Sequence, residues 1–480
     1  MRWWLYNILF FLGYMAMMPS FYRRMKKRGG YRAHFGQRLG RYEPEVLAAL
    51  AKRRRIWVHA VSVGEAYVAG RILDALRRAR PGVSVVLSTT SSTGYKVCES
   101  LVREGDVLVY FPVDFPRAVR RALDAIRPEA LVLTESELWP NMLLECQRRG
   151  IPTILMNGRV SDRSFPRYRA LRFFFGPVLR SFREIQVQFE TDRDRMLAIG
   201  AAPESVKVTG TVKFDVATPD PSKVASVRAG LAAAGFPADA KILLGASTWP
   251  GEEKTLLDAY AAIRKTAPEF RLVLVPRHAE RGDEIEALIH AEGYECWRRS
   301  QHAEGAEASA RQESHAEYAE GAEDEVSRSR NLSPSSVLNR PAQARPAPAI
   351  LLADTTGELF AFHAISDLTF VGKTLDPNVG AQNMIEPCAL GKPVVVGPHV
   401  ENFAGPMAIL LAAGAVRQER DAAGVCAALG ELAADPAARE TLGSRAAEAV
   451  AAASGSLERG VASLLRALDL PASHSPESAS

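Results

Sequence analysis

The 480-residue sequence has few cysteines and lacks common nucleotide-binding motifs. The five cysteines are scattered and odd in number, and no Cys-x-x-Cys pair occurs: Cys98, Cys146, Cys296, Cys388 and Cys426. This distribution argues against a disulfide framework and a cysteine-based metal site, and it indicates a reducing compartment. No Walker loop and no Gly-x-Gly-x-x-Gly motif is present, so neither standard phosphate-binding signature applies.

Acidic residues are absent from positions 1–42. Trp3–Met18 is almost wholly apolar, and it is followed by a basic cluster of Arg23, Arg24, Lys26, Lys27 and Arg28. A cleaved signal peptide would carry its basic residues before the apolar run and a small-residue cleavage site after it, and neither is found. We therefore expect residues 1–22 to be a membrane anchor with the rest of the chain on the cytoplasmic side. A helix that crosses the bilayer and one that lies in its interface are both compatible with the length and composition of this segment.

Short apolar runs alternate with amphipathic stretches of helical length from Ile56 onward. The predicted strands are Ile56–Val61, Val83–Ser88, Val107–Phe111, Ala130–Thr134, Thr153–Met156, Ile185–Phe189, Ile242–Ala246, Leu272–Val275, Ile350–Ala353, Leu368–Val371 and Pro393–Gly397. Such alternation is typical of parallel sheets covered on both faces. Two series of similar length, joined near Ala217–Lys223, predict an α/β protein. Its two Rossmann-like domains, residues 23–216 and 217–470, are expected to face each other across a cleft.

Two segments have a different composition. Residues 300–347 are rich in Ala, Glu, Ser and Arg and lack the pattern of a buried strand, and residues 471–480 are similar. We predict a disordered insertion and a disordered tail.

The most informative segment is Gly380–Pro398, in which a glycine-led turn precedes a short helix and an apolar strand. Free N–H groups at a helix start attract phosphate or carboxylate oxygens. Asn383 and Glu386 are three residues apart, so they share one side of the first turn. An ordinary αβ unit with a glutamate near its positive end is the simpler alternative.

Two acidic segments follow predicted strands. Ser62 and Glu65 match a capping box, in which Glu65 would reach back to the Ser62 amide. The alternative role of Glu65 is a general base that takes a proton from an attacking hydroxyl. Thr134–Asn141 carries two carboxylates at a strand end, which favours polar binding there, although a solvated loop also carries such charges.

Several other residues suit an anion. Lys213 lies near the interdomain linker, and Arg277 follows a strand, where its forked donors match phosphate. His278 is not expected to bind a metal, because no second His or Cys lies at useful spacing. Thr355–Leu359 resembles another capping box, and its Thr-Gly step would let backbone amides approach a ligand.

The ordered set of these segments resembles the bacterial 3-deoxy-D-manno-octulosonic acid (Kdo) transferases of lipopolysaccharide biosynthesis. The resemblance spans nearly the whole chain apart from the insertion and the tail. The matching segments are Tyr31–Gly40, Val58–Glu65, Thr134–Asn141, Asn157–Arg159, Gly210–Asp215, Pro276–His278, Gly357–Glu358 and Gly380–Pro387.

The resemblance implies a GT-B type inverting glycosyltransferase that moves Kdo from CMP-Kdo to the lipid A precursor (lipid IVA) at the bacterial inner membrane. It implies that Glu65 is the general base and that Glu135 and Lys213 stabilise the transition state. The implied CMP-binding residues are Pro276, Arg277, Thr356, Gly357, Glu358, Asn383, Met384, Ile385 and Glu386. No cofactor or metal is expected, because amides and cations would take up the charge of the leaving phosphate. The expected partners are CMP-Kdo, the lipid A precursor and membrane lipid.

This sequence departs from the family pattern at two of these places. Trp249-Pro250 stands where a histidine is expected after Ser-Thr, and Ala381 replaces a second glycine. Three alternatives remain: another GT-B enzyme or nucleotide-sugar epimerase, a non-catalytic membrane-bound nucleotide sensor, and a nucleic-acid binder. The last lacks aromatics interleaved with a basic groove, so no nucleic-acid partner is expected.

Overall fold

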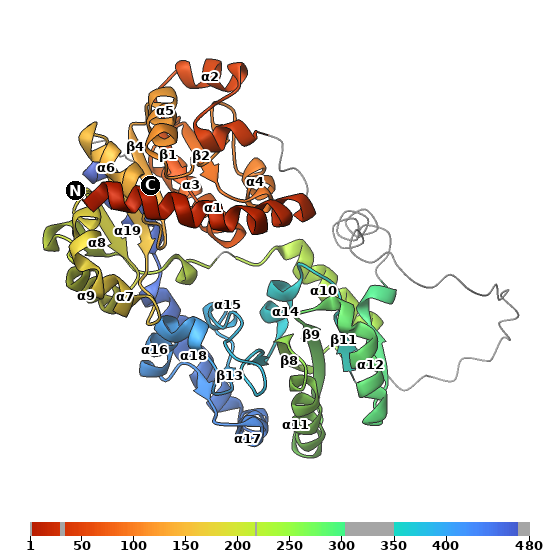
Figure 1. Cartoon of the computed structure of the whole chain (residues 1–480). Helices are drawn as coiled ribbons and strands as arrows, with labels where there is room; N and C mark the ends of the chain where they lie inside the picture. The colour runs from red at the N-terminus through yellow and green to blue at the C-terminus, as the bar shows by residue number, and fades with distance from the viewer. Residues whose placement is uncertain (1, 29–33, 217, 303–349, 469–480) are drawn as a thin grey trace, which may run out of the picture. The chain divides into compact units, whose positions relative to one another are not determined.

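The computed structural model describes residues 2–28, 34–216, 218–302 and 350–468 (Figure 1). The chain forms two compact units, Met1–Asp215 with Ala453–Ser480, and Val216–Ala452. The predicted tail 471–480 and residues 303–347 of the predicted insertion lie outside the described residues. Residues 300–302, at the start of the predicted insertion, are described, and Ser300 belongs to a short 3-10 turn, η5 (Arg299–Gln301).

The first unit contains a seven-stranded parallel sheet in the order β3-β2-β1-β4-β5-β6-β7. Its strands are β1 (Ile56–His59), β2 (Val85–Thr89), β3 (Val107–Tyr110), β4 (Ala130–Thr134), β5 (Thr153–Gly158), β6 (Glu184–Val187) and β7 (Val206–Val208). The six predicted strands of this half are confirmed. The sequence did not predict β7, because this short edge strand exposes Lys207 and Val208 and has no continuous apolar run.

Helices cover both faces of this sheet. They are α2 (Pro44–Ala51), α3 (Val63–Ala79), α4 (Ser92–Glu99), α5 (Pro116–Ile126), α6 (Pro140–Arg148), α7 (Phe165–Ala170), α8 (Arg172–Leu179), α9 (Glu190–Ile199) and α19 (Ser456–Ala467), with 3-10 turns η1 (Phe35–Leu39), η2 (Pro203–Ser205) and η3 (Val212–Phe214). Alternate side chains of each strand enter one of two cores. Trp57 and Leu131 lie in one core, and Val58 and Val132 in the other.

The predicted boundary at residue 470 is wrong, because the last helix belongs to the first unit. The side chains of Leu457, Val461 and Leu464 are buried in the core that α3 forms with the first sheet. The Asp215 carboxylate accepts hydrogen bonds from the Ser456 and Leu457 N–H groups at the start of α19. The second unit therefore ends at Ala452.

The second unit contains another seven-stranded parallel sheet, in the order β10-β11-β9-β8-β12-β13-β14. Its strands are β8 (Lys241–Thr248), β9 (Phe270–Pro276), β10 (Cys296–Arg298), β11 (Ile350–Leu352), β12 (Leu368–Val371), β13 (Val394–Val396) and β14 (Arg417–Gln418). The five predicted strands of this half are confirmed. The edge strands β10 and β14 were not predicted, since they are short and only partly buried.

The helices of this unit are α10 (Pro221–Ala233), α11 (Glu252–Thr266), α12 (Gly282–Ala291), α14 (Leu359–Ile365), α15 (Ile385–Ala389), α16 (Ala404–Ala412), α17 (Ala422–Ala434) and α18 (Pro436–Ala453), with turns η4 (Ala279–Arg281) and η7 (Glu401–Phe403). In each sheet the earlier strands lie on one side of a reversal point and the later strands lie on the other. The reversal falls between β1 and β4 in the first sheet and between β8 and β12 in the second. Ligands of such sheets bind beyond the carboxyl ends of the strands at this reversal.

The N-terminal helix α1 (Arg2–Arg28) lies along the first unit and is drawn in dark red in Figure 1. One stripe of α1, which contains Trp3, Tyr6 and Tyr14, packs against the unit: the Trp3 ring lies 4.9 Å from that of Phe174 and the Tyr14 ring 5.2 Å from that of Phe115. Between Trp4 and Met17 the remaining surface is apolar and exposed: Trp4, Leu5, Ile8, Leu9, Phe11, Leu12, Met15 and Met17. Trp3–Arg23 is long and apolar enough to cross a membrane.

Candidate active site

Glu65 lies at the reversal point of the first sheet, on the first turn of α3. One carboxylate oxygen, Oε2, accepts hydrogen bonds from the Val61 N–H at 3.0 Å and from Thr134 Oγ1 at 3.2 Å. Thr134 is the last residue of β4, so the bond joins the start of α3 to the neighbouring strand end. The other oxygen, Oε1, accepts from the Ser62 hydroxyl at 3.1 Å.

The predicted capping box is present, but one of its two hydrogen bonds has a different partner. The Ser62 hydroxyl accepts from the Glu65 N–H at 3.3 Å, as the motif requires. The return bond goes to the N–H of Val61 instead of Ser62, because the carboxylate extends toward Thr134. Glu65 thus stabilises its own helix start and also lies beside the loop after β4.

That loop contains Glu135 and Glu137 between β4 and α6. Glu135 has a left-handed backbone (φ 58°), which is costly for a residue with a side chain. Its N–H bonds to the Met156 carbonyl at 3.0 Å, and the Ser136 hydroxyl bonds to the Arg159 carbonyl at 2.6 Å. The strand ends of β4 and β5 therefore hold the beginning of the loop in place.

Burial and mutual repulsion raise the pKa values of these two carboxyl groups. Burial, and then the charge of Glu65, raises the pKa of Glu135, against the lowering effects of Lys213 and Arg159. Burial and the charge of Glu65 raise the pKa of Glu137 to about 7. A carboxyl group with such a pKa exchanges protons near neutral pH.

Two cations complete the cluster. Lys213 lies in η3, where the Thr211 hydroxyl accepts from the Lys213 N–H at 3.4 Å. Burial and the neighbouring charge of Arg159 lower the pKa of the Lys213 ammonium, and Glu135 opposes this effect. The site therefore combines three carboxyl groups with a lysine and an arginine.

The first unit thus brings together Glu65, Glu135 and Lys213, which the sequence had singled out. Glu137 and Arg159 were not among the predicted site residues. The Glu-Ser-Glu spacing and the Asn157-Gly-Arg159 motif carried the signal for them.

In the second unit, the predicted binding residues end or follow strands at the carboxyl edge of the sheet. Pro276 ends β9, and the Arg277 N–H bonds to the Thr248 carbonyl at 3.0 Å. The Arg277 side chain is exposed and has no hydrogen bond or ion pair with any residue that the structure describes. Its guanidinium therefore remains available for an anion.

Thr356, Gly357 and Glu358 lie between β11 and α14. Gly357 has a left-handed backbone (φ 80°), which glycine adopts without strain, and its carbonyl accepts from Lys223 Nζ at 2.9 Å. Glu358 is buried and forms an ion pair with Arg299. Burial raises the pKa of Glu358, but the bonds from Arg299 and Thr355 outweigh it and lower that pKa overall. The predicted capping box is wrong, because Glu358 is itself the N-cap residue of α14.

The Asn383–Glu386 segment forms a compact polar turn. Asn383 Nδ2 donates to Glu386 Oε1 at 2.9 Å, which confirms that the two side chains share one side. Asn383 Oδ1 accepts from the Ile385 N–H at 3.0 Å, so one N–H expected to be free is already bonded. Met384 and Ile385 are fully buried, so neither residue is exposed to a ligand. Burial raises the pKa of Glu386, and the bond from Asn383 lessens the effect.

The structure adds a buried glutamate that the sequence did not reveal. The carboxylate of Glu252, at the start of α11, accepts from the N–H groups of Trp249 at 2.8 Å, Lys373 at 2.9 Å and Thr374 at 2.8 Å. It thereby holds together the loops after β8 and β12, the two strands at the reversal. Lys373 Nζ lies 4.9 Å from the ring centroid of Trp249, which occupies the position where histidine was expected.

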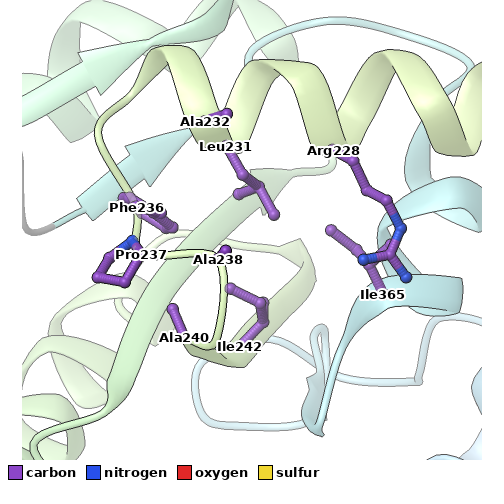
Figure 2. A pocket seen from close by; sticks show the side chains of 9 residues that line it. All are labelled: Arg228, Leu231, Ala232, Phe236, Pro237, Ala238, Ala240, Ile242 and Ile365. Carbon is purple, nitrogen blue, oxygen red and sulfur yellow. The ribbon is translucent and has the colours of Figure 1, made fainter.

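Within residues 2–28, 34–216, 218–302 and 350–468, no group of three His, Cys, Asp or Glu side chains is placed to hold a metal ion. All five cysteines are free thiols. A cavity of about 260 Å³ opens at the amino edge of the second sheet, away from the predicted binding residues (Figure 2). Its lining is apolar except for Arg228: Leu231, Ala232, Phe236, Pro237, Ala238, Ala240, Ile242 and Ile365.

Comparisons with known proteins agree with this architecture. The crystal structure of UDP-GlcNAc 2-epimerase from Neisseria meningitidis bound to UDP-GlcNAc superposes with a TM-score of 0.51 at 12 % identity, over 87 % of this chain and 99 % of that one. This likeness shows the fold, which is of the GT-B type with two Rossmann-like units.

Sequence comparison is more specific. The family model described as 3-deoxy-D-manno-octulosonic-acid transferase (kdotransferase) matches residues 33–216. The chain is 32 % identical over 453 residues to a 3-deoxy-D-manno-octulosonic acid transferase of Bordetella pertussis, covering 91 % of this chain and 93 % of the relative. A transferase of the same name from Haemophilus influenzae is 27 % identical over 82 % of this chain and 80 % of its own length. The chain therefore belongs to the 3-deoxy-D-manno-octulosonic acid transferase family of glycosyltransferases.

Proposed function

We propose that this protein transfers Kdo from CMP-Kdo to a sugar hydroxyl of a lipid A precursor, lipid IVA, with inversion at the anomeric carbon. The observation that carries the proposal is the cluster of Glu65, Glu135 and Lys213 at the reversal point of the first sheet, in a chain of this family. A protein that only bound an anionic nucleotide sugar would gain little from buried carboxyl groups there.

In the proposed reaction, the Glu65 carboxylate accepts the proton of the acceptor hydroxyl. The hydroxyl oxygen forms a bond to the anomeric carbon of Kdo, and the bond from that carbon to the CMP phosphate breaks, so that CMP leaves with the electron pair. Lys213 and Glu135 stabilise the charges that develop in the transition state. Glu137 would assist in holding the acceptor hydroxyl.

The second unit is proposed to hold the donor. Arg277 suits a phosphate or carboxylate oxygen, and Glu386 suits a ribose hydroxyl. Fixed cations and amide groups stabilise a leaving phosphate without a metal, so we expect chelators to leave transfer unchanged. Arg277→Ala is expected to weaken CMP-Kdo binding about tenfold or more, the effect of a lost charge-assisted hydrogen bond, as measured by calorimetry. Arg271→Ala is the matched control, because Arg271 lies at the opposite end of the same strand.

We further propose that α1 lies in the cytoplasmic interface of the inner membrane instead of crossing it. The stripe that packs on the first unit includes the polar residues Tyr6 and Asn7, whereas the surface exposed between Trp4 and Met17 is apolar. Next to it, α7 and α8 expose Leu171, Phe173 and a set of arginines: Arg167, Arg169 and Arg172. Apolar groups flanked by cations suit a surface of anionic lipid.

The deciding experiment incubates the full-length protein with CMP-Kdo and a lipid A precursor in vesicles and measures the product mass. We expect the acceptor to gain Kdo and free CMP to appear in equal amount. A parallel reaction without acceptor separates the alternatives. An epimerase would rearrange a nucleotide sugar without any acceptor, and a nucleotide sensor would leave CMP-Kdo intact; either result would contradict the proposal.

A further inference from the structure

Asp114 is a fully buried carboxylate that joins separate parts of the first unit. It lies between β3 and α5. Its Oδ1 accepts from the Met142 N–H at 2.9 Å, and its Oδ2 accepts from the Asn141 N–H at 3.0 Å and from the Tyr6 hydroxyl at 2.8 Å. One side chain therefore bonds to both α6 and α1.

The bonds to Asn141 and Met142 determine where α6 begins. The first N–H groups of a helix have no partner within the helix, and a capping side chain usually accepts from them. Trp139, the N-cap residue of α6, makes no such bond. Asp114 serves instead, from a distant part of the chain.

A second bond links α1 to the same helix start. Asn141 Nδ2 donates to Asn7 Oδ1 at 2.7 Å, next to the bond between Tyr6 and Asp114. Two consecutive residues of α1 are thus bonded to Asp114 and to the first turn of α6. The aromatic contacts of Trp3 and Tyr14 fix the rest of the packed stripe.

The loop that carries Glu135 and Glu137 lies directly before this helix start. At one end, the bonds to Met156 and Arg159 hold it to β5 and the residue that follows. At its other end, the loop leads into the first turn of α6, which Asp114 holds through its bonds to Asn141 and Met142. The left-handed backbone of Glu135 costs energy and persists only if both ends are held.

We propose that Asp114 is a positioning residue that couples α1 to the carboxylate loop, so that the membrane-facing helix and the carboxyl groups of Glu135 and Glu137 form one rigid body. The purpose of the coupling rests on the proposed function. A lipid acceptor presents its sugar at a set height above the bilayer, and a loop fixed to α1 stays at that height.

Tyr6→Phe removes the hydroxyl that bonds to Asp114 and leaves the cap of α6 in place. Tyr14→Phe is the matched control, because it makes the same change on the same helix without loss of a hydrogen bond to Asp114. Hydrogen exchange of the full-length protein in vesicles should be about fivefold faster for peptides covering residues 131–142 in Tyr6→Phe, as expected for one lost hydrogen bond, and unchanged in Tyr14→Phe. Equal exchange in both variants would overturn the coupling. This readout does not depend on activity, so it holds even if the proposed function fails.

Transfer kinetics test the catalytic purpose. A misplacement of about 1 Å costs up to about a hundredfold in rate, so Tyr6→Phe should lower kcat about tenfold and leave the acceptor KM and CMP binding unchanged. In a Glu135→Gln background the same change should have little further effect, since both act through the loop. Asp114→Asn should behave as Tyr6→Phe does, or more severely. If the losses in kcat from Tyr6→Phe and Glu135→Gln were additive, or if only the acceptor KM rose, the bond between Tyr6 and Asp114 would be merely structural. Either result would overturn the positioning role.

Discussion

At the scale of single residues, the carboxylate of Glu65 makes two kinds of contact. It bonds to the backbone before its own helix and to Thr134 at the next strand end. The first contact stabilises α3, and the second orients the carboxylate toward the Glu135 loop. Three hydrogen bonds thus hold the carboxylate of the proposed general base at the carboxyl edge of the sheet.

Glu65→Gln separates the hydrogen bonds of this side chain from its proposed role as general base. The amide retains an oxygen that accepts from Val61 or Thr134, so the fold and CMP binding should be preserved. It does not accept a proton, so transfer should fall by about two to four orders of magnitude, the usual contribution of a general base. Product mass over time measures the rate, and calorimetry measures CMP binding. Unchanged turnover would remove Glu65 as the base.

Glu137 makes stability depend on pH. Its pKa is raised from 4.5 to about 7 in the folded protein, chiefly by burial. Between these pH values the folded state keeps a proton that the unfolded chain releases, so the free energy of unfolding decreases as pH rises through this window. The loss is complete above about pH 7.

Glu137→Gln should remove this contribution. Its Tm should match that of the wild type near pH 4.5 and exceed it by a few degrees at pH 8, as measured by calorimetry across the range. Glu204→Gln, an exposed change in the same unit, is the control and should show no such divergence. A constant difference between Glu137→Gln and wild type at every pH would contradict the assignment.

At the scale of elements, α19 shows how the end of the chain stabilises the first unit. The side chain of Leu464 is fully buried against the core that contains α3. Leu464→Ala should lower the free energy of unfolding of the first unit by about 2–5 kcal/mol, through lost transfer energy and the cavity left behind. Leu411→Ala, an exposed leucine on α16 of the second unit, is the control.

Calorimetry of the full chain with and without CMP distinguishes the two units in this test. CMP should stabilise only the unit that binds it, so its transition marks the second unit. The other transition, that of the first unit, should occur at a lower temperature in Leu464→Ala and at an unchanged temperature in Leu411→Ala. A shift of the CMP-stabilised transition in Leu464→Ala would mean that α19 supports the second unit instead.

The sequence predicted the central strands and the largely buried edge strand β3, and it missed the edge strands β7, β10 and β14, for one physical reason. β1, β2 and β4 are buried on both faces, and a continuous apolar run reports that burial. Edge strands such as β7 and β14 expose side chains, so their sequences look like loops. The predicted boundary assigned the residues of α19 to the second domain, because no local pattern reports which of two sheets a helix contacts.

Local sequence patterns were similarly incomplete for the residues of the candidate active site. Glu65, Glu135 and Lys213 were predicted because each follows a buried strand or matches a family motif. Glu252 was missed because an acid in the first turn of a helix usually faces solvent. Its bonds to Lys373 and Thr374 join segments more than a hundred residues apart, and no local pattern records them.

At the scale of the whole molecule, the charge pattern agrees with the proposed position of α1 in a membrane interface. The chain has a formal net charge of +5, and its first 42 residues contain no acid. The exposed surface of α1 adds an apolar strip that water does not favour. Apolar insertion and attraction to anionic lipid would then act on the same unit, so high salt should weaken binding only in part.

The last prediction concerns that exposed strip. Leu9 and Leu12 are 59 % and 57 % exposed, so the double change Leu9→Ser and Leu12→Ser should leave the fold intact. Full burial of a leucine side chain is worth about 1.5–3 kcal/mol, so even partial insertion predicts at least a tenfold weaker affinity for vesicles that contain anionic lipid, measured by co-sedimentation. Val379→Ser, an equally exposed apolar change in the second unit, should leave binding unchanged. An interfacial α1 should also be released from vesicles by alkaline carbonate, because no segment of it spans the hydrocarbon. Retention after carbonate treatment, with undiminished binding of the double variant, would show that α1 crosses the bilayer.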